Sequence, residues 1–398
     1  MSLAPNVLWI VTTQWRAHAC GFAGDPNAKT PFLDALAEES VTYAHAVTPH
    51  PFGPFARAAL LTGQASPANG VRDYYDPLPP GTRTIAHDLR ERGYATAFFG
   101  KWHLGPRERG VPLVGDAHAK AIVPPEYRGG FEWWEGFEGG FRLNDPYLHG
   151  SRLPEPTPFP GYQSDVLCER AQKWIRRDAP WFCLLSMEPP HPPYEVPSSG
   201  ALPRAPAEVI LPPNVPLGGE VEARARRELA GYYAHIEATD RAIGRLLSQV
   251  GRKGTVVVVT SVHGDMHGAH GLFRKGWPYD ESVLIPLLVR TPGVAPRRDA
   301  TSISLQQLRG MTIAWAEQYA FTPDSAWSQI SMPSVVDLPH QCDRAWRGVR
   351  SPARKLVVAA DGSDWLFFDL SQDPWEMRNL VADRTYASEI AAYRSRLA

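Results

Sequence analysis

The side chains best suited to chemistry in this 398-residue chain lie where predicted strands end and where one predicted helix begins. Arg57 stands in residues 49–63, a loop rich in proline and glycine that continues as a helix. The free backbone N–H groups and the positive dipole end at a helix start favour an anion. Between His50 and Arg57 the loop has no Ser, Cys or Thr. The segment therefore predicts an anion site that lacks the usual nucleophile.

Similar polar residues follow four predicted strands. The strands cover 6–12, 94–99, 181–187 and 255–260, and the residues behind them are Thr13, Gln14, Lys101, His103, His191 and His263. In an open α/β sheet, ligands bind at the carboxyl ends of the strands. Histidine acts as a general acid or base near neutral pH, and lysine and arginine hold anionic groups. Together the strand ends predict one basic pocket, which is a more specific indication than any single histidine.

The rest of the pattern predicts an α/β fold. Helices are predicted at 30–40, 84–92, 165–177, 222–250 and 301–320, a strand at 283–289 behind a loop that holds Lys275, and a connector at 322–338. Residues 104–160 are irregular and aromatic, and form either a wall or lid of the site or a packed surface loop. Short strands at 355–359 and 365–369 precede a last helix at 386–397. We expect a large mixed, mostly parallel sheet sandwiched by helices in residues 1–335, and a small C-terminal subdomain with an antiparallel sheet and a helix in residues 336–398.

The composition limits the class of partner. A formal net charge of -1 with 43% hydrophobic and 21% charged residues predicts a globular protein without overall attraction to nucleic acid or to a membrane surface. The apolar run at residues 7–11 is too short for a signal peptide or a membrane span, so a cytoplasmic location is expected. The four cysteines have no CxxC spacing, which favours buried free thiols. An anionic small molecule is the expected partner, and a homo-oligomer is left open.

Eight stretches carry a resemblance to a known family. They are NVLWIVTTQWR, TPFLDALAEESVTYAHA, RAALLTG, GYATAFFGKWHLG, EPPHPPY with its histidine, YYAHIEATDRAIGRLL, VVVVTSVHGDMHGAHGLFRKGWPYDESVLIPLLVR and FFDLSQDPWEMRNL. With these motifs the chain resembles the sulfatase branch of the alkaline phosphatase superfamily, and its opening is similar to phosphonate monoester hydrolases and arylsulfatases. The resemblance implies an alkaline-phosphatase-like fold. It also implies that Arg57, Lys101, His103, His191 and Lys275 match positions that contact the nucleophile or the sulfuryl or phosphoryl oxygens.

The chain departs from the family pattern at its reactive positions. The family makes its nucleophile, a formylglycine, from a Cys or Ser four residues before the motif arginine, and that position here is Gly53. The family's metal-binding carboxylates fall on Thr13 and Val262, which leaves Gln14 and His263. Since hard cations need several oxygen ligands, we expect neither a metal ion nor another cofactor. His18 stands where related sequences carry Asp.

The histidines of residues 263–270 admit a second interpretation. Imidazoles suit zinc, but their spacing here matches no standard zinc motif and three glycines favour a loop. Hydrogen bonds within the loop are therefore the favoured interpretation of these histidines.

Three functions follow from this pattern. The first is an enzyme that performs metal-independent group transfer, hydrolysis or condensation on an anionic small molecule, as in a biosynthetic pathway. Its expected catalytic residues are His263, His191, His103, Thr13 and His18, and its substrate-binding residues are Arg57, Lys101, Lys275 and Gln14. The second is an anion-binding protein without catalysis, and the third is a metal-dependent sulfuric or phosphoric ester hydrolase with unusual ligands.

Overall fold

The computed structural model describes residues 4–175, 180–251, 254–319, 321, 323 and 325–397. Its main element is a ten-stranded sheet in the order β10-β2-β9-β8-β1-β7-β3-β4-β5-β6. The strands, in sheet order, are Arg297–Ser304, Val41–Val47, Leu287–Arg290, Thr255–Ser261, Asn6–Thr12, Trp181–Ser186, Ala95–Lys101, Trp133–Phe137, Tyr147–Gly150 and Leu153–Pro158. From β8 to β4 every neighbouring pair is parallel, whereas β9, β5 and β6 pair antiparallel. The predicted large mixed, mostly parallel sheet is therefore confirmed.

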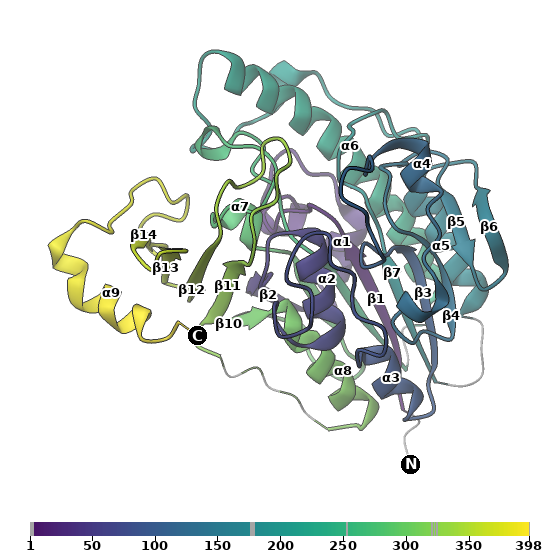
Figure 1. Ribbon diagram of the computed structural model, residues 1–398. Coiled ribbons are helices and arrows are strands. Elements are labelled where there is room, and N and C mark those ends of the chain that lie inside the picture. Colours follow the sequence, from purple (N-terminus) through teal and green to yellow (C-terminus); the bar gives the residue numbers. More distant parts are fainter. Residues whose placement is uncertain are drawn as a thin grey trace.

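Helices cover both faces of this sheet (Figure 1). Side chains alternate between the faces along a strand, so that Trp9 of β1 joins one core and Leu8 the other. The helices on the side of Trp9 are α2 (Gly53–Thr62), α3 (Ile85–Arg90) and α8 (Leu308–Ala316), and those on the side of Leu8 are α1 (Pro31–Ala37), α5 (Gln163–Trp174) and α6 (Glu220–Gln249). The central strands are buried on both faces, which explains their continuous apolar sequences.

A second sheet of four antiparallel strands lies beside the large one, next to β10 and β2 (Figure 1). Its strands are β11 (Ser328–Met332), β12 (Trp346–Arg350), β13 (Arg354–Ala359) and β14 (Asp364–Asp369), followed by α9 (Ala387–Arg394). The expected small antiparallel sheet with one helix is confirmed. The division at residues 335 and 336 stays a prediction, and β11 lies on its N-terminal side.

The structure corrects several sequence expectations. Residues 297–304 are strand β10, although a helix was expected from residue 301, because Ser302, Ile303 and Ser304 are buried beside β2. The expected connector at 322–338 contains β11, and its residues 322 and 324 lie outside the described part of the chain. The strand expected at 283–289 is shorter, since α7 (Asp280–Val283) comes first. Strand β2 was not predicted, and α4 (Gly115–Ala119) and β4 to β6 occupy parts of the irregular segment 104–160.

Candidate anion-binding site

The carboxyl ends of four adjacent parallel strands meet at one edge of the sheet. These strands are β8, β1, β7 and β3, and their order brings His263, Thr13, Gln14, His191, Lys101 and His103 to a common edge. Helix α2 begins at the same edge with Gly53 and adds Arg57. The structure thus places eight of the nine expected site residues around one cavity and its floor, with Lys275 as the eighth.

Gly53 stands at the position where the resemblance described above expects the nucleophile. A Cβ atom added there would lie 2.7 Å from His103 Nδ1 and 3.1 Å from Arg57 Nη1. Gly53 is the first residue of α2, and Phe52 is its N-cap. The imidazole and the guanidinium therefore crowd the space that a side chain at this position would need.

Arg57 has unused hydrogen-bonding capacity. Its side chain is buried, and Nη2 donates to Thr13 Oγ1 at 2.8 Å. Its Nε and Nη1 have no hydrogen-bond partner among the described residues. Burial lowers the pKa of Arg57 to about 10, so the group is charged at neutral pH. Since buried donors without partners are costly, an anion bound beside Arg57 would be stabilised.

Lys101 is already paired with a carboxylate. Its Nζ lies 2.5 Å from Glu188 Oε1, and both side chains are buried. Gln163 holds Glu188 in place, accepting from its backbone N–H at 2.9 Å. Burial, opposed by the Glu188 charge, lowers the pKa of Lys101. Sequence reasoning did not name Glu188 as a site residue, although it stands two residues after β7 and is the first residue of the stretch EPPHPPY.

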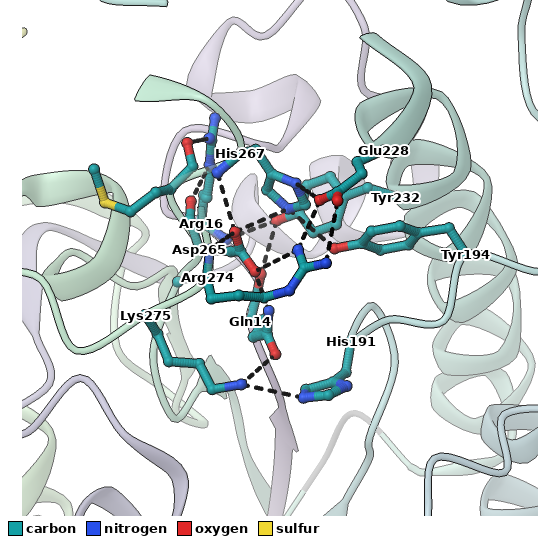
Figure 2. A network of polar contacts seen from close by, with 12 residues as sticks. Gln14, Arg16, His191, Tyr194, Glu228, Tyr232, Asp265, His267, Arg274 and Lys275 are labelled. Carbon is teal, nitrogen blue, oxygen red and sulfur yellow. Dashed lines mark hydrogen bonds and ion pairs between the residues drawn. The ribbon is translucent and has the colours of Figure 1, made fainter. Parts of the chain in front are cut away.

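Lys275 lies between two other polar groups (Figure 2). Its Nζ donates to Gln14 Oε1 at 2.9 Å and to His191 Nε2 at 3.2 Å. Burial lowers the pKa of Lys275 to about 7, and the Asp265 charge opposes that shift. An amine with a pKa near neutrality can bind an anion as the ammonium ion and can also exchange a proton at physiological pH.

Asp265 is a second carboxylate that sequence reasoning missed. It accepts a short hydrogen bond from Gln14 Nε2, and bonds from the backbone N–H groups of His267 at 3.0 Å and Arg274 at 3.1 Å. Figure 2 shows this carboxylate between Gln14 and the side chain of Arg274, whose Nη1 also pairs with Glu228 at 2.6 Å. Asp265 thereby fixes the amide orientation of Gln14, so that Oε1 faces Lys275.

The pocket histidines are held as neutral imidazoles. Because a carbonyl oxygen can only accept, His263 Nδ1 donates to Gly264 O at 2.8 Å and His191 Nδ1 donates to Pro192 O at 2.5 Å. Burial, followed by a nearby lysine, holds the pKa of His263, His191 and His103 well below the ordinary value. At neutral pH these rings are therefore uncharged, and the ring nitrogen that carries no proton can accept a hydrogen bond. The Nε2 of His263 has no hydrogen-bond partner in the described part of the chain.

The side chains at the family's metal positions do not fit a hard cation. The Thr13 hydroxyl donates to Met187 O at 2.9 Å, Val262 offers only hydrocarbon, and Gln14 Oε1 accepts from Lys275. A divalent ion such as Ca²⁺ or Mg²⁺ needs several oxygen ligands, of which carboxylates are the strongest. Within the described ranges no three or more His, Cys, Asp or Glu side chains group as metal ligands. His267 and His270 instead contact Tyr232 and Tyr279 in aromatic pairs.

His18 lies apart from these residues. It is exposed, lies 5.8 Å from Trp375 between ring centres, and lines a second cavity of about 290 Å³. Arg16, which precedes it, turns back and donates through Nε to Asp265 O at 2.6 Å. Arg16 and His18 both line the second cavity, and neither lines the main one.

The main cavity has a volume of about 680 Å³. Lys101, His103, His191 and Lys275 line its inner end, and residues 113–116 and 139–142 of the irregular segment form part of its wall. Thr13, Gln14, Arg57 and His263 lie buried at or beneath the floor. The helices formed by the described residues include none long and apolar enough to cross a membrane.

Comparison with known proteins gives a consistent family match. The sulfatase family model matches residues 5–316. The chain is 37% identical over 316 residues to the ulvan-active sulfatase of Formosa agariphila, which covers 75% of this chain and 58% of that longer protein. It is 26% identical to an arylsulfatase of Clostridium perfringens over 98% of this chain and 92% of the relative.

Two solved structures have the same fold. The sulfatase homologue yidJ from Bacteroides fragilis superposes with a TM-score of 0.84 at 24% identity, over 99% of this chain and 94% of the other. The phosphonate monoester hydrolase of Agrobacterium radiobacter gives a TM-score of 0.75 at 22% identity, over 98% of this chain and 94% of the other. At these identities the two likenesses show the fold.

Proposed function

We propose that this chain, which belongs to the sulfatase family, binds a small molecule by its anionic group. The bound molecule then reacts without formylglycine or a metal ion. The reaction classes are group transfer, hydrolysis and condensation. The observation that carries the proposal is the set of buried nitrogens without partners among the described residues, Arg57 Nε and Nη1, His103 Nδ1 and His263 Nε2. Of these atoms, His103 Nδ1 and Arg57 Nη1 lie beside Gly53. A sulfuryl, phosphoryl or carboxylate group held beside Arg57 at the inner end of the cavity would accept from the arginine N–H groups.

The roles of the residues follow from their charges. Arg57 remains charged and stabilises negative charge that develops on the substrate. The ammonium form of Lys275 adds a second cation at the inner end of the cavity. His263 and His103 are neutral in the free protein. The negative charge of a bound anion raises their pKa, and in that state they accept a proton from a co-substrate or from water. Lys101 is partly neutralised by Glu188, so it contributes less to anion binding than its charge alone suggests.

The proposal includes independence from metal ions. After exhaustive dialysis against a chelator we expect elemental analysis to find far less than one metal ion per chain, with sulfate affinity unchanged. Calcium or magnesium bound at one ion per chain, together with hydrolysis of an aryl sulfate that is lost on chelation, would instead establish the metal-dependent hydrolase.

Turnover is tested by mass spectrometry on the full chain incubated with aryl sulfates, phosphate and phosphonate monoesters and carboxylates, each with and without alcohol and amine acceptors. We expect a product with at least one class of anion, and loss of that product in His263→Ala. A matched control is His87→Ala, since His87 lies in α3 away from the cavity. Tight anion binding without any product would favour the non-catalytic binding protein. Unchanged turnover in His263→Ala would refute the role assigned to this imidazole.

A further inference from the structure

We infer that the substrate carries its anionic group on a compact apolar or aromatic body and not on a sugar. The inference rests on the proposed function, because it places the anion at the inner end of the main cavity. It concerns the remaining space in that cavity, whose volume of about 680 Å³ suits a small organic molecule. Three features of the wall support it: its aromatic rings, the loop that presents one of them, and the pairing of its polar groups.

Three aromatic rings of the wall each lie next to a cation. Lys101 Nζ is 5.1 Å from the centre of the Phe141 ring, and Lys275 Nζ is 5.6 Å from that of Phe52. The guanidinium carbon of Arg107 is 4.9 Å from the centre of the Tyr74 ring. The anion-binding end of the cavity therefore adjoins aromatic carbon directly, so a bound molecule meets an apolar surface as soon as it extends beyond its anionic group.

The backbone holds Phe141 in an unusual conformation. Its φ is 61°, which bulky side chains rarely adopt, and Gly140 before it has a φ of 111°. A Cβ on Gly140 would lie 2.6 Å from Ala119 Cβ, so this loop packs tightly against α4. The imidazole of His191 stacks on the Phe141 ring with 4.6 Å between centres. A strained residue persists where the surroundings fix it, and such strain is typical of ligand sites.

Several polar side chains of the wall are engaged with other protein groups, while Arg142 Nε and His103 Nδ1 have no hydrogen-bond partner among the described residues. Arg142 Nη2 pairs with Asp116 at 2.5 Å, and Arg274 pairs with Glu228. Gln341 accepts from the backbone N–H of Lys275 at 3.3 Å. The apolar part of the wall consists of Leu113, Val114, Pro192, Pro193, Leu338 and Pro339, and the polar residues Asp116, His118 and Glu195 also line the cavity.

A sugar would leave several of its hydroxyl groups facing the aromatic and apolar part of this wall. Buried hydroxyls without partners lose the hydrogen bonds that water gives them. An aryl or alkyl group makes no hydrogen bonds to water that could be lost, and burial of its apolar surface favours binding. The wall thus favours an apolar body over a polyhydroxylated one.

The test measures affinity by calorimetry for phenyl phosphate, glucose 6-phosphate and inorganic phosphate, so that the anion is the same in all three. We expect phenyl phosphate to bind at least tenfold more tightly than glucose 6-phosphate. Equal or tighter binding of glucose 6-phosphate would overturn the inference and leave the proposed anion site intact. Failure of all three, and of phenyl sulfate, to bind would instead refute the proposed function.

Variants test whether the Phe141 ring is responsible for the preference for phenyl phosphate over glucose 6-phosphate. Phe141→Asn removes the ring and suits the backbone, because Asn tolerates a positive φ. We expect it to reduce the ratio of the two affinities to about threefold or less, while Leu217→Asn, at an apolar residue that is 73% exposed and outside the cavity, keeps the ratio. Thermal unfolding of both variants checks that they are folded. A folded Phe141→Asn protein with an undiminished ratio would refute the role of the ring.

Discussion

The pKa of Lys275 allows a quantitative prediction of how anion affinity depends on pH. Its pKa is about 7, below the ordinary lysine value of 10.5, because the amine is buried. A lowered lysine pKa means that the free protein loses this charge as pH rises through 7. An anion binds the ammonium form, so binding above pH 7 requires the uptake of one proton, and the affinity falls as pH rises.

The magnitude follows from the fraction of protein that carries the ammonium ion. One pH unit above the pKa about a tenth of the protein is protonated, and two units above it about a hundredth. Sulfate affinity should therefore be nearly constant below pH 6 and about tenfold weaker at pH 8, equivalent to about 1.4 kcal/mol. The other charged groups facing the amine, which are Asp265, Lys101, Arg274 and Glu188, set the position of this midpoint.

Isothermal calorimetry with sulfate is the appropriate assay, since sulfate does not titrate between pH 5 and 9. Repeating the titration in buffers with different ionisation enthalpies counts the protons, and about one per sulfate is expected at pH 8. Lys275→Arg keeps its charge throughout, so its affinity should lose the pH dependence. Lys29→Arg is the matched control, because Lys29 is 67% exposed and outside the cavity. A wild-type affinity that is flat from pH 6 to 9, or an unchanged slope in Lys275→Arg, would refute the reasoning.

Two further predictions concern the floor of the cavity. Lys101→Met leaves the Glu188 charge buried and without its lysine partner, so the free energy of unfolding measured in urea titrations should fall by about 3–5 kcal/mol. Adding Glu188→Gln to this variant should restore most of the lost stability. A loss below about 1 kcal/mol in Lys101→Met would contradict the pairing. Gly53→Ala places a methyl group 2.7 Å from His103 Nδ1, so the imidazole must move. We expect sulfate affinity to fall about tenfold and the free energy of unfolding to fall by about 1–2 kcal/mol. Gly310→Ala, in helix α8 with no contact closer than 3.4 Å, is the control and should leave affinity unchanged.

The fold could be predicted because its strongest signals are local. The central strands are buried on both faces, so their apolar runs were visible in the sequence. Strand β2 was missed because it mixes buried and half-buried residues, and β10 because only its last three residues are buried. The burial of those residues is set by pairing with distant strands, which no short window of sequence contains.

The candidate site was predictable by position but not by charge. The rule that ligands bind at strand ends placed Thr13 and Lys101 near each other. It could not show that Lys101 is paired with Glu188, because that pairing depends on two side-chain orientations 87 residues apart in the chain. It also could not separate His18 from the pocket, since His18 lines a second cavity that no local pattern in the sequence indicates.

The charges at the cavity floor explain why the proposed losses of nucleophile and metal go together. Positions 13 and 262 follow the paired strands β1 and β8. Two buried Asp carboxylates there would repel each other without a dication between them. Thr13 and Val262 avoid that repulsion, and the Thr13 hydroxyl supports Arg57 instead. The ammonium of Lys275 then bonds to Gln14 Oε1, the oxygen that a metal ion would need. Under the proposed function, restoring a Cys at position 53 alone would therefore not recreate a metal-dependent sulfatase, because Thr13 and Val262 still supply no carboxylate for a cation.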